Sequence, residues 1–209
     1  NDRYMKSPSL PEAPASRRQF DRQEALETAM ELFWQHGYEC TTMSMLLKAM
    51  DLTAPSLYAT FGNKEKLFAE AVRHYVDSYG AKIFAPLAEP ITAREAIERL
   101  LKNSVACVSA SKTPAGCLVT FGTVNCSDEN DPAAEMLIEL RKNNERLLRG
   151  RLVRAVREKE LPASADPARL ARYFYAVLGG IQLRSLDGAT RAELEAIAED
   201  AMLAWPGKK

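Results

Sequence analysis

A short helix between residues 53 and 66 constrains the fold of this chain more than any other stretch. Leu57 and Phe61 lie four residues apart, so their side chains share one helix face and bury together. We expect little more than one turn, because Gly62 and Asn63 interrupt the helix before Lys64 opens the next one. The opposite face is left free and carries small or hydroxylic residues with one tyrosine at its edge, namely Thr53, Ser56, Ala59, Thr60 and Tyr58. A helix that is held from behind and presents such a face has the geometry of a helix-turn-helix recognition element.

The residues before this element predict two supporting helices. Asp21 and Glu24 have the spacing of a capping box, and Gly37 suits the left-handed conformation that closes a helix. Thr41 or Thr42 begins the second helix. The apolar residues expected to point inward from the two helices are Ala25, Ala29, Leu32, Phe33, Met43, Leu46, Leu47 and Met50. A tight turn at residues 51–52 then leads into the recognition element.

The remainder of the chain is predicted to be helical as well. A longer helix runs from Lys64 to about Phe84 and is stopped by Pro86. Further helical patterns cover residues 92–109, 116–124, 132 to about 160, 166–186 and 190–205. No strand-like alternation of useful length occurs, so the predicted fold class is all-α: a three-helix helix-turn-helix domain followed by a larger helical bundle. We divide the chain into a flexible arm (residues 1–16), a DNA-binding domain (17–66) and a C-terminal domain (67–209).

Composition excludes several classes of function. No apolar run approaches the roughly twenty residues that span a bilayer, and the first residues do not read as a signal peptide, so we expect a cytoplasmic protein without a membrane partner. The net charge is +0, which argues against indiscriminate coating of nucleic acid. Any DNA affinity must come from the placement of basic residues at the start of the first helix and beside the recognition element, namely Arg17, Arg18, Arg22, Lys48, Lys64 and Lys66. The chain has no nucleophile elbow, phosphate-binding glycine loop or His-Glu zinc motif, so we expect neither an enzyme nor a cofactor.

The residues from 20 to about 75 resemble the TetR family of bacterial transcriptional regulators. The resemblance is carried by four stretches: Leu32-Phe33-Trp34-Gln35-His36-Gly37-Tyr38, Thr41-Thr42-Met43, Ser56-Leu57-Tyr58-Ala59-Thr60-Phe61 and Lys64-Glu65-Lys66-Leu67-Phe68. Beyond residue 80 only Gly116-Cys117-Leu118-Val119 is similar to a recurrent feature of one branch. One departure is Asp51, which stands where the family usually has glycine; Asp tolerates the left-handed conformation better than most residues.

The resemblance implies a homodimeric repressor that binds a palindromic double-stranded DNA operator and is released by a small-molecule effector of unknown identity. By the family pattern Thr42, Tyr58 and Lys64 contact phosphates. The residues that approach bases by the same pattern are Thr53, Ala54, Pro55, Ser56 and Thr60. Arg17 and Arg18 form either an ordinary polar arm or an arm that reaches the minor groove. From spacing alone Tyr58 is equally a core aromatic with its hydroxyl satisfied.

The C-terminal domain supplies the predicted dimer interface and the predicted pocket. The interface residues recur at helical spacing, although a protomer of this size could instead bury that face internally: Leu170, Phe174, Val177, Leu178 and Ile181. We expect a small apolar or aromatic effector among Phe84, Val105, Cys117, Phe121, Leu140 and Phe174, unless these residues form a filled core. In the mechanism that we predict, the effector favours a dimer with the wrong spacing between its recognition helices.

The four cysteines leave an alternative open. Cys107, Cys117 and Cys126 fall within one segment, while Cys40 lies apart. No Cys-x-x-Cys spacing occurs and only two histidines are available, so we predict no metal site and expect buried, unreactive thiols. A thiol- or soft-metal-responsive regulator that uses the three clustered cysteines is the minority interpretation. A helical sensor or interaction module without DNA binding is the other class considered.

Overall fold

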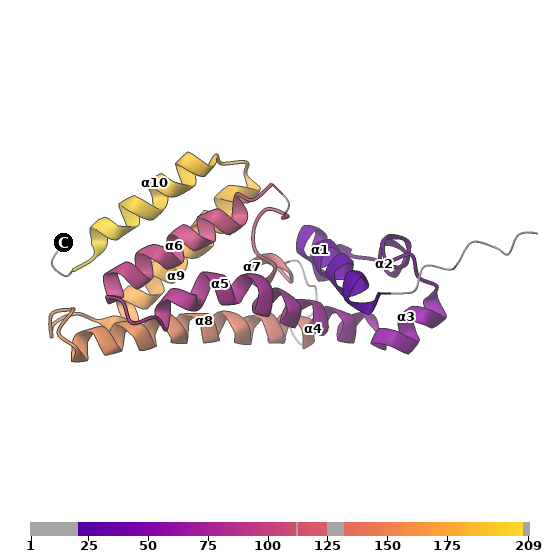
Figure 1. Ribbon diagram of the computed structural model, residues 1–209, viewed down its shortest axis with the longest axis horizontal. Helices are drawn as coiled ribbons and strands as arrows, with labels where there is room; N and C mark the ends of the chain where they lie inside the picture. The colour runs from indigo at the N-terminus through magenta and orange to yellow at the C-terminus, as the bar shows by residue number, and fades with distance from the viewer. Residues whose placement is uncertain (1–20, 112, 125–131, 207–209) are drawn as a thin grey trace, which may run out of the picture.

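The computed structural model describes residues 21–111, 113–124 and 132–206, and these segments fold into α-helices without a strand among them (Figure 1). The predicted all-α class is therefore confirmed. The arm at residues 1–16, Arg17, Arg18 and Cys126 lie outside the described residues. No helix in the described segments is long and apolar enough to cross a membrane.

The N-terminal unit contains helices α1 (Arg22–Cys40), α2 (Met43–Ala49) and α3 (Ala54–Phe61). The Asp21 side chain caps α1 by accepting from the backbone N–H groups of Gln23 and Glu24, as predicted. Gly37 has a φ of 74° and kinks the helix instead of ending it. A side chain there would crowd the carbonyl of Gly122, which accepts a hydrogen bond from the Tyr38 N–H at 2.7 Å.

Local hydrogen bonds also set the start of the recognition helix. Thr42 caps α2, whereas Thr41 is buried and donates to the Gly37 carbonyl at 2.6 Å. Asp51 adopts a φ of 52°, so the left-handed turn expected at this position is confirmed. The following helix α3 has 8 residues, about two turns and longer than predicted. Leu57 and Phe61 are both buried, as their spacing predicted.

A single helical path connects this unit to the rest of the molecule. It consists of α4 (Lys64–Tyr75), a π-helical segment (Val76–Gly80) and α5 (Ala81–Phe84), and it ends in a 3₁₀ turn (Ala85–Leu87). The predicted end near residue 84 is confirmed. The π-helical segment was not predicted from the sequence; such wide turns interrupt α-helices most often at functional sites.

The C-terminal bundle contains the remaining helices, and Figure 1 shows the long ones, α6, α8, α9 and α10, as a group beside the α4–α5 path. Their bounds are α6 (Ala93–Val108), α7 (Leu118–Phe121), α8 (Pro132–Arg157), α9 (Pro167–Leu186) and α10 (Arg191–Ala201), followed by a 3₁₀ turn (Met202–Ala204). Four of the five predicted helical ranges are matched closely. The range 116–124 instead yields the four-residue helix α7.

Two apolar cores hold these helices together. In the first, helix α1 packs along α4, and the rings of Phe33 and Phe68 meet edge to face with centroids 5.0 Å apart. The same core includes Leu118 and Leu137, which belong to α7 and α8. The N-terminal core therefore extends past residue 66 and is joined to the C-terminal half.

The second core corrects the predicted dimer interface. Phe174, Leu178 and Ile181 are buried inside the protomer among α6, α8 and α10, so their side chains are not available to a partner. Leu170 and Val177 pack against the same core. The predicted residues do recur at helical spacing, but they form the inner face of α9 and not a dimer interface. The outer side of α9 is a different stripe, formed by Tyr173, Ala176, Gly180 and Leu183.

A buried arginine closes the far end of the bundle. The Arg151 side chain is 1% exposed, and its Nη2 donates to the Ile91 carbonyl at 2.6 Å and to Glu160 at 3.2 Å. Glu160 also accepts the backbone N–H of Ala93, the first residue of α6. Burial alone would raise the pKa of Glu160, but the hydrogen bonds from Ala93 and Arg151 outweigh it and hold this pKa below its ordinary value.

This pair predicts a pH-dependent contribution to stability. A carboxylate with a lowered folded-state pKa stabilises the protein above its unfolded pKa of about 4.3, and the contribution is lost as the pH falls through the folded value. We expect Glu160→Gln to lower the free energy of unfolding by about 1–3 kcal/mol at pH 7, as measured by urea denaturation. The difference from wild type should shrink below about pH 4.

Glu195→Gln is the matched control, because Glu195 forms an exposed ion pair with Arg191 and should contribute little at either pH. If Glu160→Gln lowered the free energy of unfolding by the same amount at pH 7 and at pH 3, the charge of Glu160 would not be the cause of the lost stability.

Candidate nucleic-acid interface and internal pocket

The outer face of helix α3 is open to solvent, while its inner face is fully packed. Tyr58 is 52% exposed, so it is not a core aromatic and its hydroxyl is free to meet a partner surface. The remaining exposed or half-exposed residues on this side are those predicted to approach DNA bases: Thr53, Ala54, Pro55, Ser56 and Thr60. Thr42 is exposed at the start of α2. The fold therefore brings the predicted contact residues of α2 and α3 to the surface.

Hydrogen bonds within α3 hold its hydroxyl groups in place. The Thr53 and Ser56 hydroxyls lie 2.9 Å apart, and the Thr60 hydroxyl donates to the Ser56 carbonyl at 2.8 Å. A hydroxyl has one donor and two acceptor positions, so these bonds leave capacity for base edges or phosphates. The face is thus ordered before it meets any partner, which lowers the entropic cost of binding.

Lys64 stands at the first position of α4, where the helix dipole disfavours a cation. Its Nζ lies 4.3 Å from the centroid of the Tyr38 ring, an attractive cation–π arrangement. Tyr38 in turn packs on Phe68 with ring centroids 4.8 Å apart. The N-terminal core therefore fixes the ammonium group beside the recognition helix. Arg22 lies over the Phe61 ring at 4.7 Å from its centroid and also pairs with Glu70 at 2.6 Å.

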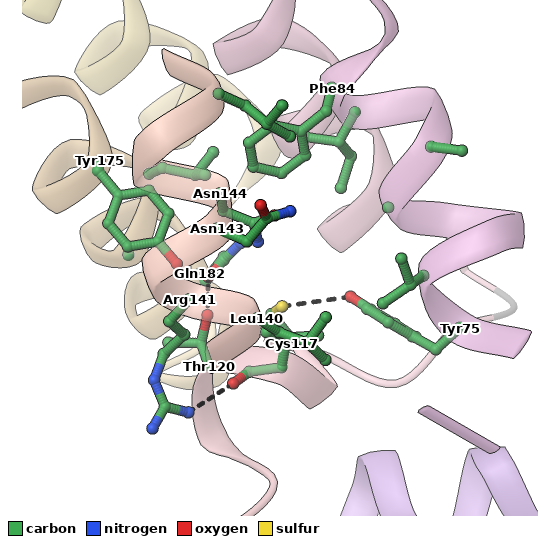
Figure 2. Close-up of a pocket in the computed structure, with 18 of the residues that line it drawn as sticks. Tyr75, Phe84, Cys117, Thr120, Leu140, Arg141, Asn143, Asn144, Tyr175 and Gln182 are labelled. Carbon is green, nitrogen blue, oxygen red and sulfur yellow. Dashed lines mark hydrogen bonds between the residues drawn. The ribbon is translucent and has the colours of Figure 1, made fainter. Parts of the chain in front are cut away.

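A cavity of about 240 Å³ lies behind this unit, between the α4–α5 path and helices α7, α8 and α9 (Figure 2). Tyr75 and Tyr175 stand on opposite sides of it, and Phe84 closes one end. The π-helical segment contributes Val76, Asp77 and Gly80 to its wall. Because the cavity touches the helix that bears the DNA-facing unit, a molecule inside it is in direct contact with that helix.

Three of the six predicted pocket residues line this cavity, namely Phe84, Cys117 and Leu140. Phe121 lines a second, more polar cavity of about 150 Å³ that adjoins α1, with Cys117 between the two spaces. The prediction was wrong for Val105 and Phe174. Both side chains are buried in the core of the bundle and line neither cavity.

Several wall residues were missed by the sequence analysis, including Tyr175, Gln182 and Asn144. Gln182 did carry a signal. It follows Leu178 by four residues on the inner side of α9, and a long polar side chain on this mainly apolar face indicates a partner or a cavity. The residue that predicts the cavity is thus the one that breaks the apolar pattern.

An aromatic cluster connects the cavity to helix α1. The Tyr75 hydroxyl donates to Cys117 Sγ at 3.3 Å, and the Tyr75 ring meets the Trp34 ring edge to face at 4.7 Å. Tyr79 stacks on Tyr75 and also touches Trp34, with centroids 5.5 and 5.0 Å apart. Burial raises the pKa of Tyr75 well above its usual value, so its hydroxyl remains a donor at neutral pH.

The two described thiols of the predicted cysteine cluster, Cys107 and Cys117, do not have the character of reactive groups. Cys117 is buried and accepts the Tyr75 hydrogen bond. Burial raises the pKa of Cys107 to about 11, which disfavours the nucleophilic thiolate. Among the described residues no group of three His, Cys, Asp or Glu side chains is placed to hold a metal ion. For Cys107 and Cys117 these observations give no support to the thiol-sensor alternative, while Cys126, its third member, lies outside the described residues.

Comparison with protein families identifies both halves of the chain. Residues 25–71 match the family described as "Bacterial regulatory proteins, tetR family". Residues 93–199 match the family described as "Tetracyclin repressor-like, C-terminal domain". Residues 72–92 lie between the two matches, which together cover the DNA-facing unit and the bundle.

Individual relatives agree with this assignment. The HTH-type transcriptional repressor ComR of Escherichia coli (strain K12) is 34% identical over 188 residues, which is 90% of each chain. An operator-DNA complex of a cysteine mutant of the TetR family transcriptional regulator CifR has a TM-score of 0.86 at 36% identity, covering 92% of this chain and 100% of that chain. A TetR transcriptional regulator from Chloroflexus aurantiacus shares the fold, with a TM-score of 0.77 at 20% identity over 87% of this chain and 92% of that chain. The chain therefore belongs to the TetR family of bacterial regulatory proteins.

Proposed function

We propose that the protein is a transcriptional repressor that binds a palindromic operator as a homodimer and releases it when a small molecule occupies the internal cavity. The observation that carries the proposal is helix α3, whose exposed polar face is held rigidly from behind by Leu57 and Phe61. The operator complex of CifR, a relative at 36% identity, supports the same use of this surface. The proposed role is regulatory and not enzymatic, and it places the protein with the DNA in the bacterial cytoplasm.

In the proposed contact, Thr42, Tyr58 and Lys64 bind phosphates, while Thr53, Ala54, Pro55, Ser56 and Thr60 approach base edges. Phosphate contacts supply affinity and register, and base contacts supply sequence preference. The cation–π contact with Tyr38 supports this role for Lys64, because it fixes the charge without neutralising it. Arg17 and Arg18 precede α1 in the chain and remain candidates for a minor-groove arm.

The dimer is proposed to form through the outer stripe of α9, together with α8. Tyr173, Ala176, Gly180 and Leu183 recur at helical spacing and are exposed in the protomer. A Cβ atom added at Gly180 would meet nothing within 4 Å, so a partner helix has room to approach the backbone closely. Val153 is 50% exposed on α8 and offers further apolar surface. A two-fold axis there would present two recognition helices to one face of DNA.

The switch is proposed to act along the α4–α5 path. A molecule in the cavity touches Tyr75 and Val76, and Tyr75 contacts Trp34 of α1. A shift of these contacts would move α3 and change the separation of the two recognition helices from the groove repeat of roughly 34 Å or its multiples. Because coupling is reciprocal, operator DNA must weaken effector binding by the same factor that the effector weakens operator binding.

The first test concerns the DNA-binding surface. Gel shifts with the region upstream of the protein's own gene, repeated over a salt series, should reveal specific binding. Lys64→Ala and Tyr58→Phe should weaken binding at all sequences alike, and the lysine change should also lower the salt slope by about one unit. Ser56→Ala or Thr60→Val should instead alter sequence preference, by about 1–3 kcal/mol for a lost base contact.

Lys102→Ala is the matched control, since it removes an exposed lysine from α6, away from α3. If Lys64→Ala and Lys102→Ala had the same small effect on affinity and slope, Lys64 would be an ordinary surface charge. Failure of the wild-type protein to bind any upstream fragment specifically would overturn the proposed function.

The second test concerns the dimer. Leu183 is 49% exposed, so Leu183→Glu should leave the protomer folded but place a charge in the proposed interface. We expect sedimentation at micromolar concentration to show a dimer for wild type and a monomer for this variant. Leu203→Glu is the control, because Leu203 is 74% exposed outside the stripe and its replacement should leave the dimer intact. An intact Leu183→Glu dimer would contradict the proposed interface.

A further inference from the structure

The size of the cavity limits the effector to a small molecule. A volume of about 240 Å³ lies below the range of roughly 300–1,000 Å³ that is typical for drug-sized ligands. An engineered protein cavity of about 150 Å³ holds benzene, so the cavity here fits a molecule with on the order of ten non-hydrogen atoms.

The cavity wall carries two charged residues, one acidic and one basic. Asp77 is the acidic residue, and it is exposed to solvent. The other is Arg141, whose Nη1 donates to the Val119 carbonyl at 2.7 Å. In Figure 2 its guanidinium group extends past Thr120 and away from Phe84. Burying an unpaired charge is costly, so the cavity favours an uncharged occupant.

The polar wall of the cavity includes the hydrogen-bond donors of Gln182 and Tyr175, beside Asn143 and Asn144, which can donate and accept. Gln182 is 4% exposed, and its Oε1 accepts from the Thr120 hydroxyl at 2.6 Å. This bond fixes the orientation of the amide and leaves the two N–H donors of Nε2 without a partner in the described part of the chain. Tyr175 lines the same side of the cavity. Burial raises the pKa of Tyr175 to about 12, so its hydroxyl also remains protonated.

We propose that the effector is a small uncharged molecule with an aromatic or aliphatic body and one carbonyl-type acceptor, which binds the Nε2 group of Gln182. The body packs between the Phe84 and Tyr75 rings and the side chain of Leu140. The acceptor pairs with a donor that the protein itself leaves open to the cavity, which discriminates against molecules that lack an acceptor. This inference rests on the proposed effector-controlled function and specifies the chemistry of its site.

Four probes of nearly equal size test the proposal on the full-length protein. They are acetophenone (uncharged acceptor), isopropylbenzene (no acceptor), benzoate (anion) and benzylamine (cation), titrated by calorimetry or ligand-observed NMR. We expect acetophenone to bind about tenfold more tightly than isopropylbenzene and the two ions to bind more weakly still.

Two variants tie the preference to the amide group. Gln182→Leu should reduce acetophenone affinity about tenfold while leaving isopropylbenzene affinity within about threefold. Thr120→Val removes the hydroxyl that donates to Gln182 Oε1 but keeps both Nε2 donors, so it should weaken acetophenone binding by releasing the orientation of the amide. Far-ultraviolet circular dichroism and sedimentation establish that both variants remain folded dimers.

Tighter binding of benzoate or benzylamine than of acetophenone would overturn the proposal, as would unchanged acetophenone affinity in Gln182→Leu. Absence of binding by all four probes up to their solubility limits would also overturn it. Operator affinity is measured on the same samples. If acetophenone binds as expected but leaves operator affinity unchanged, the chemistry of the site stands and the effector-controlled function fails.

Discussion

The packing of helix α4 against helix α1 is the contact on which the other features depend. Phe68 and Tyr75 of α4 meet Phe33 and Trp34 of α1 edge to face, at 5.0 and 4.7 Å between ring centroids. Interlocked aromatic side chains resist small displacements, because close-packed interiors leave them little space to adjust. Helix α1 and the first half of α4 therefore behave as one body, and this body carries α3 by burying its Leu57.

The same helix reaches the cavity at its other end. Tyr75 takes part in the aromatic contact with α1 and also lines the cavity. Its hydroxyl donates a hydrogen bond to Cys117 Sγ, just before α7. The π-helical segment follows immediately, where the regular hydrogen-bond ladder of the helix is already altered. A helix is more easily rearranged at such a point than within a regular turn. The cavity thus lies against the part of the path that is most suited to move.

The local patterns predicted the N-terminal unit well, because each of its features is encoded by neighbouring residues. The Asp21 cap, the left-handed Asp51 and the buried pair of Leu57 and Phe61 follow from short spacings. The partner of each helix face could not be predicted in this way. The repeat that contains Phe174 indicates a buried stripe on α9 but not whether a second protomer or the same protomer covers it. The cavity wall is assembled from residues of five α-helices and the π-helical segment, so a local signal such as Gln182 indicates a cavity or a partner but not which residues enclose it.

Filling the cavity tests the central claim, that its occupancy controls the DNA-binding unit, without any added ligand. In Leu140→Trp the larger ring would enter the cavity and act as a permanent occupant, whereas Leu203→Trp adds the same ring to an exposed site. Operator affinity is measured by fluorescence anisotropy for both variants, after circular dichroism and sedimentation have established that they are folded dimers. The account predicts at least about a tenfold loss of affinity for Leu140→Trp, which corresponds to a coupling of about 1.4 kcal/mol, and no loss for Leu203→Trp. Wild-type affinity in a folded Leu140→Trp dimer that no longer binds acetophenone would contradict it.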